Sequence, residues 1–189
     1  MLKTATGKFV KRVSRPFAGK LARAFVRRQD GAAAIEFGLV AAPFLALVFA
    51  IMETAIVFFA GQTLEAAVAD TARLIMTGQA QTQGFDQTSF KNQVCSKVYG
   101  LFDCANGVYV DVKSYSNFAS VNTTAPVQNG KLDTSNFTYQ PGGPGDIVVV
   151  SLYYQWPVYI SLLGFNLSDL SGGKRLLAAT SAFRNEPYQ

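Results

Sequence analysis

The stretch Arg27–Ala55, RRQDGAAAIEFGLVAAPFLALVFAIMETA, places a short polar sequence directly before a long apolar run. Sixteen residues, Phe37–Met52, carry no charge, and continuing to residue 60 adds only Glu53 as a charged position. A helix over Ala32–Ala60 would be about 43 Å long at ~1.5 Å per residue, which exceeds a hydrocarbon core of about 30 Å. The pattern predicts one transmembrane helix over residues 32–60.

Two residues inside this apolar run, Pro43 and Glu36, are unusual for a membrane-spanning helix and must be explained. Pro43 should either kink the helix or be tolerated by local adjustment, as prolines in membrane helices often are. Glu36 has two interpretations. A charge deep in lipid costs about 2.5–3.5 kcal/mol and is a functional hypothesis by default, whereas a charge near the headgroups costs little.

The charge of the chain is divided unevenly between its ends. Residues 1–30 hold nine Lys and Arg against one acidic residue, and the remainder holds eight basic and eleven acidic residues. Basic residues on one side of a single span predict a cytoplasmic N-terminus, with the rest of the chain outside. A cleaved secretory signal is disfavoured, because its apolar region is usually about 7–15 residues and a small-residue cleavage site follows it. The basic residues that raise the isoelectric point are concentrated in residues 1–30. The high isoelectric point therefore gives no support for a nucleic-acid-binding domain.

The chain has no histidine and two cysteines, Cys95 and Cys104. A Ser-His-Asp triad is excluded, and a structural zinc site is disfavoured. We expect no enzyme activity, no cofactor, no metal and no small-molecule substrate. Composition leaves a disulfide and a pair of buried thiols open. In an oxidising compartment outside the membrane the two would close a small loop, contributing about 2–3 kcal/mol.

Beyond the span, apolar residues recur at intervals of three and four, which predicts that the helix continues over residues 61–78 with one apolar face. The face comprises Val57, Ala60, Leu64, Ala67, Val68, Thr71, Leu74 and Ile75. Gly78 and the polar sequence after it should end the helix. This half either packs on the chain's own domain, which we favour, or offers small residues such as Ala66 and Ala69 to another helix.

Residues 79–189 predict a small domain with one short helix and a sheet. The apolar spacing in Ser89–Tyr99 predicts the helix, and Val108–Tyr115, Asp146–Trp156 and Lys174–Phe183 predict three strands. Residues 117–145 predict a long loop, and Val158–Leu170 predicts an apolar loop or short helix that caps the sheet, lies on the membrane or meets another subunit. The expected fold class is α+β: a long N-terminal helix packed on a small antiparallel sheet.

The sequence Gly31-Ala-Ala-Ala-Ile-Glu36-Phe37 resembles the processing site of type IV prepilins, a glycine followed by an apolar helix with glutamate at its fifth position. After a basic leader it resembles, more narrowly, the TadE-like family of the tight-adherence (Flp) pilus system. Pro144–Tyr153 and the terminal Arg184–Tyr188 are also similar to parts of TadE-like proteins. Residues 80–140 carry no motif of that family.

The resemblance implies a pilin-like fold and cleavage between Gly31 and Ala32 by a membrane-bound prepilin peptidase on the cytoplasmic side. Glycine lets the protease approach the backbone closely. Cleavage would remove residues 1–31 and leave a new α-amino group on Ala32, one helical turn before Glu36. Glu36 would then pair with the Ala32 amine of a neighbouring subunit, and such a pair can fix register.

These features together predict a minor pilin or pseudopilin of a single-pass inner-membrane type, with the domain in the periplasm or outside the cell after assembly. Its predicted partners are the prepilin peptidase, other pilus subunits and the membrane. The alternative is a membrane-anchored periplasmic binding or adhesion module that is neither processed nor assembled. A membrane-tethered enzyme is a weaker third hypothesis. The sequence does not assign the position in the pilus, methylation of Ala32, or the role of residues 117–145 and 158–170.

Overall fold

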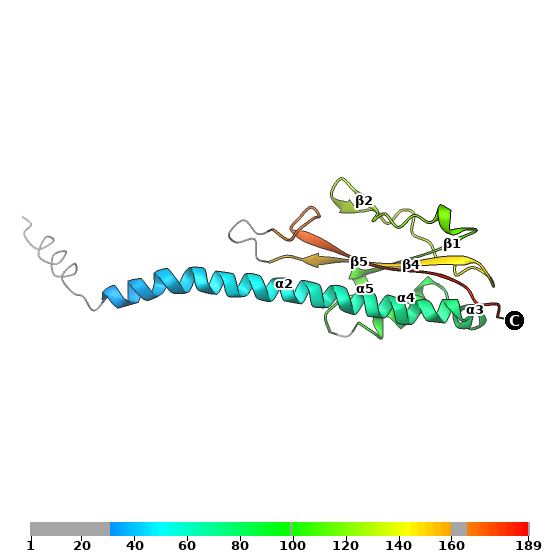
Figure 1. Ribbon diagram of the computed structural model, residues 1–189, viewed down its shortest axis with the longest axis horizontal. Coiled ribbons are helices and arrows are strands. Elements are labelled where there is room, and N and C mark those ends of the chain that lie inside the picture. Colours follow the sequence, from blue (N-terminus) through cyan, green and yellow to red (C-terminus); the bar gives the residue numbers. More distant parts are fainter. Residues whose placement is uncertain (1–30, 99, 160–165, 189) are drawn as a thin grey trace, which may run out of the picture. The chain divides into compact units, whose positions relative to one another are not determined.

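The computed structural model describes residues 31–98, 100–159 and 166–188. Its longest element is helix α2, Ala32–Met76 (Figure 1). The chain divides into two compact units, one ending at Leu45 and one beginning at Ala46, and α2 contributes to both. The predicted span and its predicted continuation are one helix, which passes through Pro43 without ending. The basic leader predicted over residues 1–31 lies outside the described residues, apart from its last glycine.

Helix α2 ends at Met76, two residues before the predicted end at Gly78. Gly78 has a φ of 77°, in the left-handed region, and its N–H donates to the carbonyl of Ile75 at 3.0 Å. A left-handed residue just after the last helical turn is a common way to end a helix, and glycine adopts that conformation without a Cβ penalty. The short helix α3, Gln79–Thr82, follows directly and was not predicted.

The sheet has three antiparallel strands in the order β1-β4-β5, so the last two strands of the chain pair with each other. They are β1, Val108–Tyr115; β4, Ile147–Pro157; and β5, Lys174–Arg184. The bounds of β1 agree with the prediction, whereas β4 lies one residue later and β5 ends one residue later than predicted. The α+β fold class, with a long helix packed on a small antiparallel sheet, is confirmed (Figure 1).

Strand β4 is the centre of the sheet, and most of it is buried on both faces. Alternate residues of a strand point to opposite faces. Val148, Val150 and Leu152 belong to the hydrophobic core that also contains the buried face of α2. The residues between them, such as Ser151 and Tyr153, line the opposite face of the sheet.

The predicted apolar face of α2 is buried in this core. Leu64, Ala60 and Ile75 are completely inaccessible, and Leu74 packs against the core while partly buried. Ala67 is buried, but Ala66 and Ala69 are exposed. This half of the helix therefore packs on the chain's own domain, as the favoured interpretation predicted.

A short helix, α4, Gln87–Cys95, packs into the same core through Phe90 and Val94. It begins two residues earlier than predicted, because Asp86 caps it: the carboxylate accepts a hydrogen bond from the backbone N–H of Ser89 at 2.7 Å. It also ends four residues earlier than the predicted end at residue 99, which lies outside the described residues.

Cys95, at the end of α4, forms a disulfide with Cys104, the first residue of the one-turn helix α5, Cys104–Gly107. Their Cα atoms are 5.7 Å apart. The predicted disulfide is confirmed, and the alternative of two buried thiols is wrong. The disulfide joins α4 to the segment that leads into β1.

The segment 117–145 contains more structure than the long loop that was predicted. It holds a 3-10 turn, η2, Phe118–Ser120, and a two-stranded hairpin of β2, Val127–Gln128, and β3, Lys131–Leu132. Asn129 and Gly130 form its turn with φ values of 51° and 71°. Positive φ at both central residues defines the turn type for which Asn-Gly is preferred. The prediction missed this hairpin because each of its strands has only two residues.

The apolar segment Val158–Leu170 was predicted to be a loop or a short helix. Its described residues, 158–159 and 166–170, form no helix and include one isolated bridge, between Leu170 and Lys174. Residues 160–165 lie outside the described residues. Leu170 is buried, in keeping with the predicted capping role at this point of the segment.

Candidate functional site

The residues singled out for processing and assembly lie at the start of α2. Ala32 is its first residue, and Gly31 precedes it directly. Glu36 and Phe37 follow one turn later, and all four are exposed. A Cβ built on Gly31 would meet no atom of the described residues within 4 Å. Among those residues, none covers the backbone at the predicted cleavage site.

The N-terminal half of α2, defined here as Ala32–Met52, exposes large apolar side chains all around the helix. They include Ile35, Phe37, Leu39, Val40, Phe44, Leu45, Leu47, Phe49, Ile51 and Met52, each at least 48% exposed. Helix α2 is long and apolar enough to cross a membrane, and no part of its most apolar 18-residue stretch is buried. An apolar surface of this extent requires a lipid or protein environment.

Glu53 is a residue that the sequence analysis missed. It is only 8% exposed and begins the C-terminal half of α2, defined here as Glu53–Met76. Its Oε1 accepts a hydrogen bond of 2.6 Å from the backbone N–H of Tyr159, just after β4. The sequence could have indicated this burial, because Glu53 lies four residues before Val57 and so extends the buried face of α2 by one turn.

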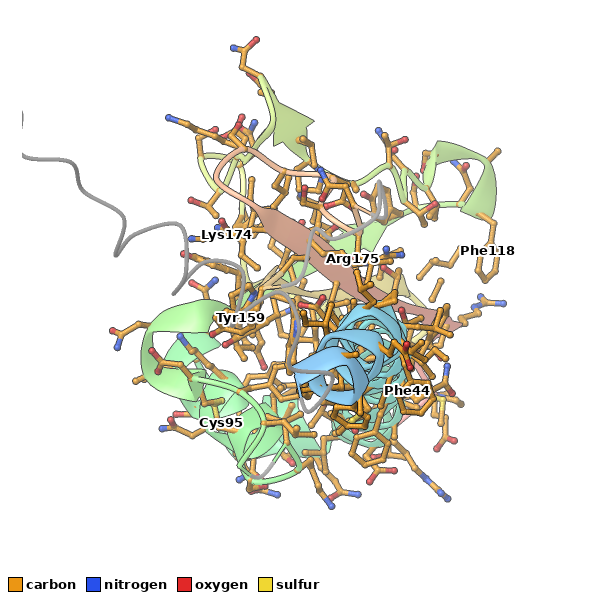
Figure 2. All side chains as sticks on the ribbon, turned by 90° about the vertical axis from the view of Figure 1, so that its left-hand side faces the viewer. Phe44, Cys95, Phe118, Tyr159, Lys174 and Arg175 are labelled. Carbon is orange, nitrogen blue, oxygen red and sulfur yellow. A yellow bond between two sulfur atoms is a disulfide. The ribbon has the colours of Figure 1, made fainter. Side chains whose placement is uncertain are left out.

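An apolar hollow adjoins Glu53. Its volume is about 250 Å³, and besides Glu53 it is lined by Phe49, Met52, Ile56, Trp156 and Tyr159, which we call the aromatic hollow. The Tyr159 side chain is 82% exposed beside it. In the end-on view, Tyr159 lies on the opposite side of the domain from Phe118 (Figure 2). The hollow thus belongs to one end of the sheet and the adjacent turns of α2.

At the other end of the domain, the two C-terminal motifs of the sequence meet. The Asn185 side chain is buried and donates hydrogen bonds to the carbonyls of Pro141, at 2.9 Å, and Gly143, at 3.0 Å. Its backbone N–H donates to the carbonyl of Asp146 at 2.8 Å. The Arg184 Nε donates to the carbonyl of Gly145, also at 2.8 Å. The glycine-rich turn before β4 is therefore held by the residues that follow β5.

The same tail secures the end of α2. The N–H of Glu186 donates to the carbonyl of Met76 at 2.9 Å, which satisfies one of the helix's terminal carbonyls. The ring of Tyr188 lies against Gly78 so closely that a Cβ there would come within 2.4 Å of it. Burial, and then the charge of Asp146, raise the pKa of Tyr188. We call this set of contacts the C-terminal junction; it gives both motifs a structural role.

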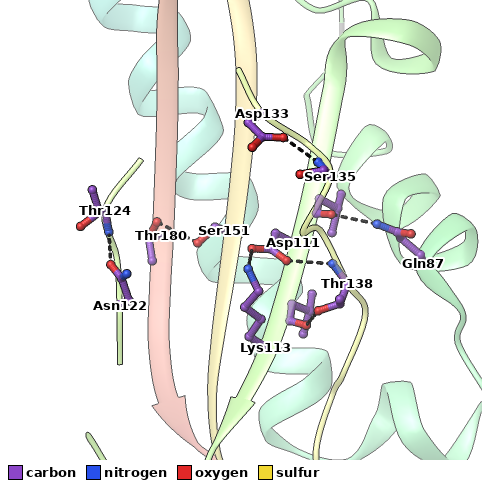
Figure 3. Close-up of polar contacts among 12 residues, drawn as sticks. Gln87, Asp111, Lys113, Asn122, Thr124, Asp133, Ser135, Thr138, Ser151 and Thr180 are labelled. Atoms are coloured by element: carbon purple, nitrogen blue, oxygen red, sulfur yellow. Dashed lines mark hydrogen bonds and ion pairs between the residues drawn. The ribbon is translucent and has the colours of Figure 1, made fainter. Parts of the chain in front are cut away.

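A polar cleft of about 420 Å³ lies on the face of the sheet opposite α2. Asp111, on its floor, accepts hydrogen bonds from Lys113 Nζ at 2.7 Å and from the N–H of Thr138 at 2.9 Å (Figure 3). Ser151 and Thr180 hydroxyls are 3.1 Å apart on neighbouring strands. The other lining residues include Tyr115, Asn122, Thr124, Gln128, Asn136 and Tyr153. Burial raises the pKa of Tyr153.

Within the described part of the chain, no three Cys, Asp or Glu side chains lie together as a metal site would require. What distinguishes the described residues is an exposed apolar helix that continues into the core of a small α+β domain. This is an α+β architecture with one candidate membrane span among the described residues.

Residues 31–73 match the family model described as TadE-like protein. The match begins at the glycine of the predicted cleavage site and ends within the buried half of α2. It confirms the resemblance to the TadE-like family over this segment and does not extend to Pro144–Tyr153 or Arg184–Tyr188. No curated protein and no solved structure matches the chain.

Proposed function

We propose that this protein is a minor pilin or pseudopilin that joins a tight-adherence pilus after a prepilin peptidase cleaves it between Gly31 and Ala32. The observation that carries the proposal is that the family match begins at Gly31, directly before helix α2. From Ala32 to Val40 every residue of this helix is exposed. In this proposal residues 1–31 are the leader and Ala32 becomes the mature N-terminus.

Charge and exposure support the orientation required by this function. The leader carries nine basic residues and one acidic residue, whereas the rest of the chain is net negative, with eight basic and eleven acidic residues. The disulfide between Cys95 and Cys104 suits an oxidising compartment. Both features favour a cytoplasmic leader and a domain on the other side of the inner membrane.

Glu36 has a specific part in the proposal. It lies four residues after Ala32, so the new α-amino group and the carboxylate project from the same face of the helix, one turn apart. Both residues are exposed. In an assembled bundle the carboxylate of one subunit would pair with the amine of the next, which fixes their relative register.

The test is the N-terminal sequence and intact mass of the full chain recovered from membranes that contain a prepilin peptidase. We expect the wild-type protein to begin at Ala32 and the Gly31→Ala variant to remain largely uncut. Gly38→Ala is the matched control, because Gly38 is also an exposed glycine with no atom near its Cβ position. Recovery of a wild-type chain that still begins at Met1, or equal inhibition by both substitutions, would contradict the proposal.

The assembly step is tested separately with Glu36→Ala. We expect pilus incorporation to fail, measured as loss of the protein from sheared filaments. Normal incorporation of the Glu36→Ala variant would remove the carboxylate from the assembly mechanism and leave only cleavage in the proposal.

A second function, a membrane-anchored binding or adhesion module, is favoured by the polar cleft over the sheet. Its carboxylate, amide, hydroxyl and tyrosine side chains suit an uncharged polar ligand. The two functions are separated by processing, because a plain anchored module has no need of Gly31 or Glu36. An adherence defect in Asn136→Ala, in a chain that is neither cleaved at Gly31 nor found in sheared filaments, would support the second.

A further inference from the structure

We propose that the end of the domain carrying Trp156 and Tyr159 is inserted into the membrane leaflet on the domain's side, with a phospholipid acyl chain in the aromatic hollow. The inference rests on α2 being the membrane span, which is part of the proposed function. It adds a lipid-binding surface on the globular domain itself. The observations that carry it are the depth of Glu53 along the helix and the residues that cover it.

The apolar surface of α2 extends beyond Met52. The 21 residues Ala32–Met52 would span about 31 Å, which already equals a hydrocarbon core of about 30 Å. Apolar exposure does not stop there, because Phe58 and Phe59 are 67% and 62% exposed. A span ending at Phe59 would begin near Leu39 and place Glu53 about 9 Å inside the hydrocarbon. Glu53 therefore lies between the edge of the leaflet and that depth.

Glu53 brings a carboxyl group to that depth. A carboxylate facing lipid at such a depth is costly, and a buried polar group needs a hydrogen-bond partner. The fold meets both requirements, because Glu53 is 8% exposed and accepts the N–H of Tyr159 at 2.6 Å. The backbone of Tyr159, just after β4, is one of the groups that cover it. Since Tyr159 touches Glu53, Tyr159 must lie at the same depth in the membrane.

The aromatic hollow is apolar almost throughout, and its side chains come from α2 and from the end of β4. Trp and Tyr are the residues enriched where hydrocarbon meets the headgroups. The half-exposed Phe49, Met52 and Ile56 continue the helix surface into the hollow. A flexible hydrocarbon chain is therefore the occupant that this lining favours, and no cation or headgroup is needed to hold it.

The chain contains one tryptophan, Trp156, in the hollow itself. The experiment incorporates the full chain into phosphatidylcholine vesicles that contain lipids brominated either near the headgroup or near the methyl end of the acyl chain. Bromine quenches nearby indole fluorescence. We expect a large loss of Trp156 fluorescence with shallow bromines, a smaller loss with deep bromines, and little quenching by iodide in the water.

The matched control moves the reporter to a distant part of the domain. Trp156→Phe combined with Phe118→Trp places the only indole at an exposed position on the opposite side of the domain from Tyr159 (Figure 2). We expect this indole to be quenched by iodide and not by brominated lipid. Equal lipid quenching at both positions would overturn the proposal, because the contact would then not be specific to the hollow.

The failure of this inference is distinguishable from that of the proposed function. Protein that resists alkaline carbonate extraction while Trp156 is quenched only by iodide keeps α2 as a span and overturns lipid binding by the hollow. Protein that is washed from the vesicles overturns the span and this inference together. Cleavage at Gly31 is measured separately and does not affect the quenching result.

Discussion

The two halves of α2 have similar helical geometry and opposite surroundings. In the N-terminal half every large apolar side chain except Val48 is about half exposed or more, whereas in the C-terminal half Leu64 and Ile75 are fully buried. The two halves differ in exposure because they differ in the elements of the chain that pack against them. The sheet and α4 cover one face of the C-terminal half, whereas Val48 is the one large apolar side chain of the N-terminal half that described residues partly cover.

This comparison explains how one helix serves two purposes. Burial of apolar surface stabilises whichever state provides it, at about 25 cal/mol per Å². For the C-terminal half that state is the folded domain, so its substitutions should change domain stability. For the N-terminal half that state is a membrane or an assembly, so its substitutions should change partitioning and leave the domain intact. The predictions below test this separation.

The largest expected effect comes from a pair of leucine substitutions. Leu64→Ala removes a fully buried side chain and should lower the free energy of unfolding of the domain by about 2–5 kcal/mol. Leu47→Ala, at a position 53% exposed, should change it by less than about 0.5 kcal/mol. Denaturant unfolding in detergent, followed by Trp156 fluorescence, measures both. Similar decreases in the free energy of unfolding for the two variants would contradict the difference between the two halves of α2.

Removing the disulfide should have the next largest effect. Cys95 and Cys104 are nine positions apart in the sequence, and closing a loop of that size is expected to contribute about 2–3 kcal/mol. The Cys95→Ser, Cys104→Ser double variant should therefore unfold at lower denaturant. Its resistance to carbonate extraction should equal that of the wild type, because α2 remains complete. Loss of membrane association in this variant would show that the halves are not independent.

The C-terminal junction provides a sharper test of how α2 ends. Gly78 and Gly84 both have positive φ, but only Gly78 has the Tyr188 ring against it. Gly84→Ala should cost about 1 kcal/mol for the backbone alone. Gly78→Ala should cost more, because its Cβ would overlap the ring. Adding Tyr188→Ala to Gly78→Ala should recover part of the difference in a thermal or denaturant unfolding series; no recovery would rule out the ring contact as the cause.

The sequence predicted the elements whose buried residues recur at a regular spacing along the chain. Strict alternation defined Val108–Tyr115, and spacing of three and four defined the buried face of α2. The hairpin at Asn129-Gly130 was missed although Asn-Gly is a strong turn signal, because its strands are too short to alternate. The cysteine pair was left open by composition and is settled only by the fold that brings α4 and α5 together.

The parts of the candidate site that could not be predicted depend on contacts between distant segments. Glu53 was treated as a charged interruption of an apolar run, and its burial requires the end of β4, more than a hundred residues later. Asn185 is likewise ordinary in sequence, and its role requires the turn at Gly143. The start of α2 was predictable because Gly31 and Glu36 belong to one short motif.

The smallest effect expected is at the cap of α4, the helix that helps to bury the C-terminal half of α2. Hydrogen bonds from Ser89 lower the pKa of Asp86 below its ordinary value of 3.8. The ionised cap therefore stabilises the fold fully above that value, and the contribution is lost as the pH falls through the lowered pKa. Asp86→Ala should reduce Tm modestly at neutral pH, and the difference from the wild type should shrink in acid. Asp86→Asn keeps an acceptor without a titrating group, so its Tm should stay close to the wild type at neutral pH. A difference between Asp86→Ala and wild type that persists below the lowered pKa would assign the effect to packing instead of the charge.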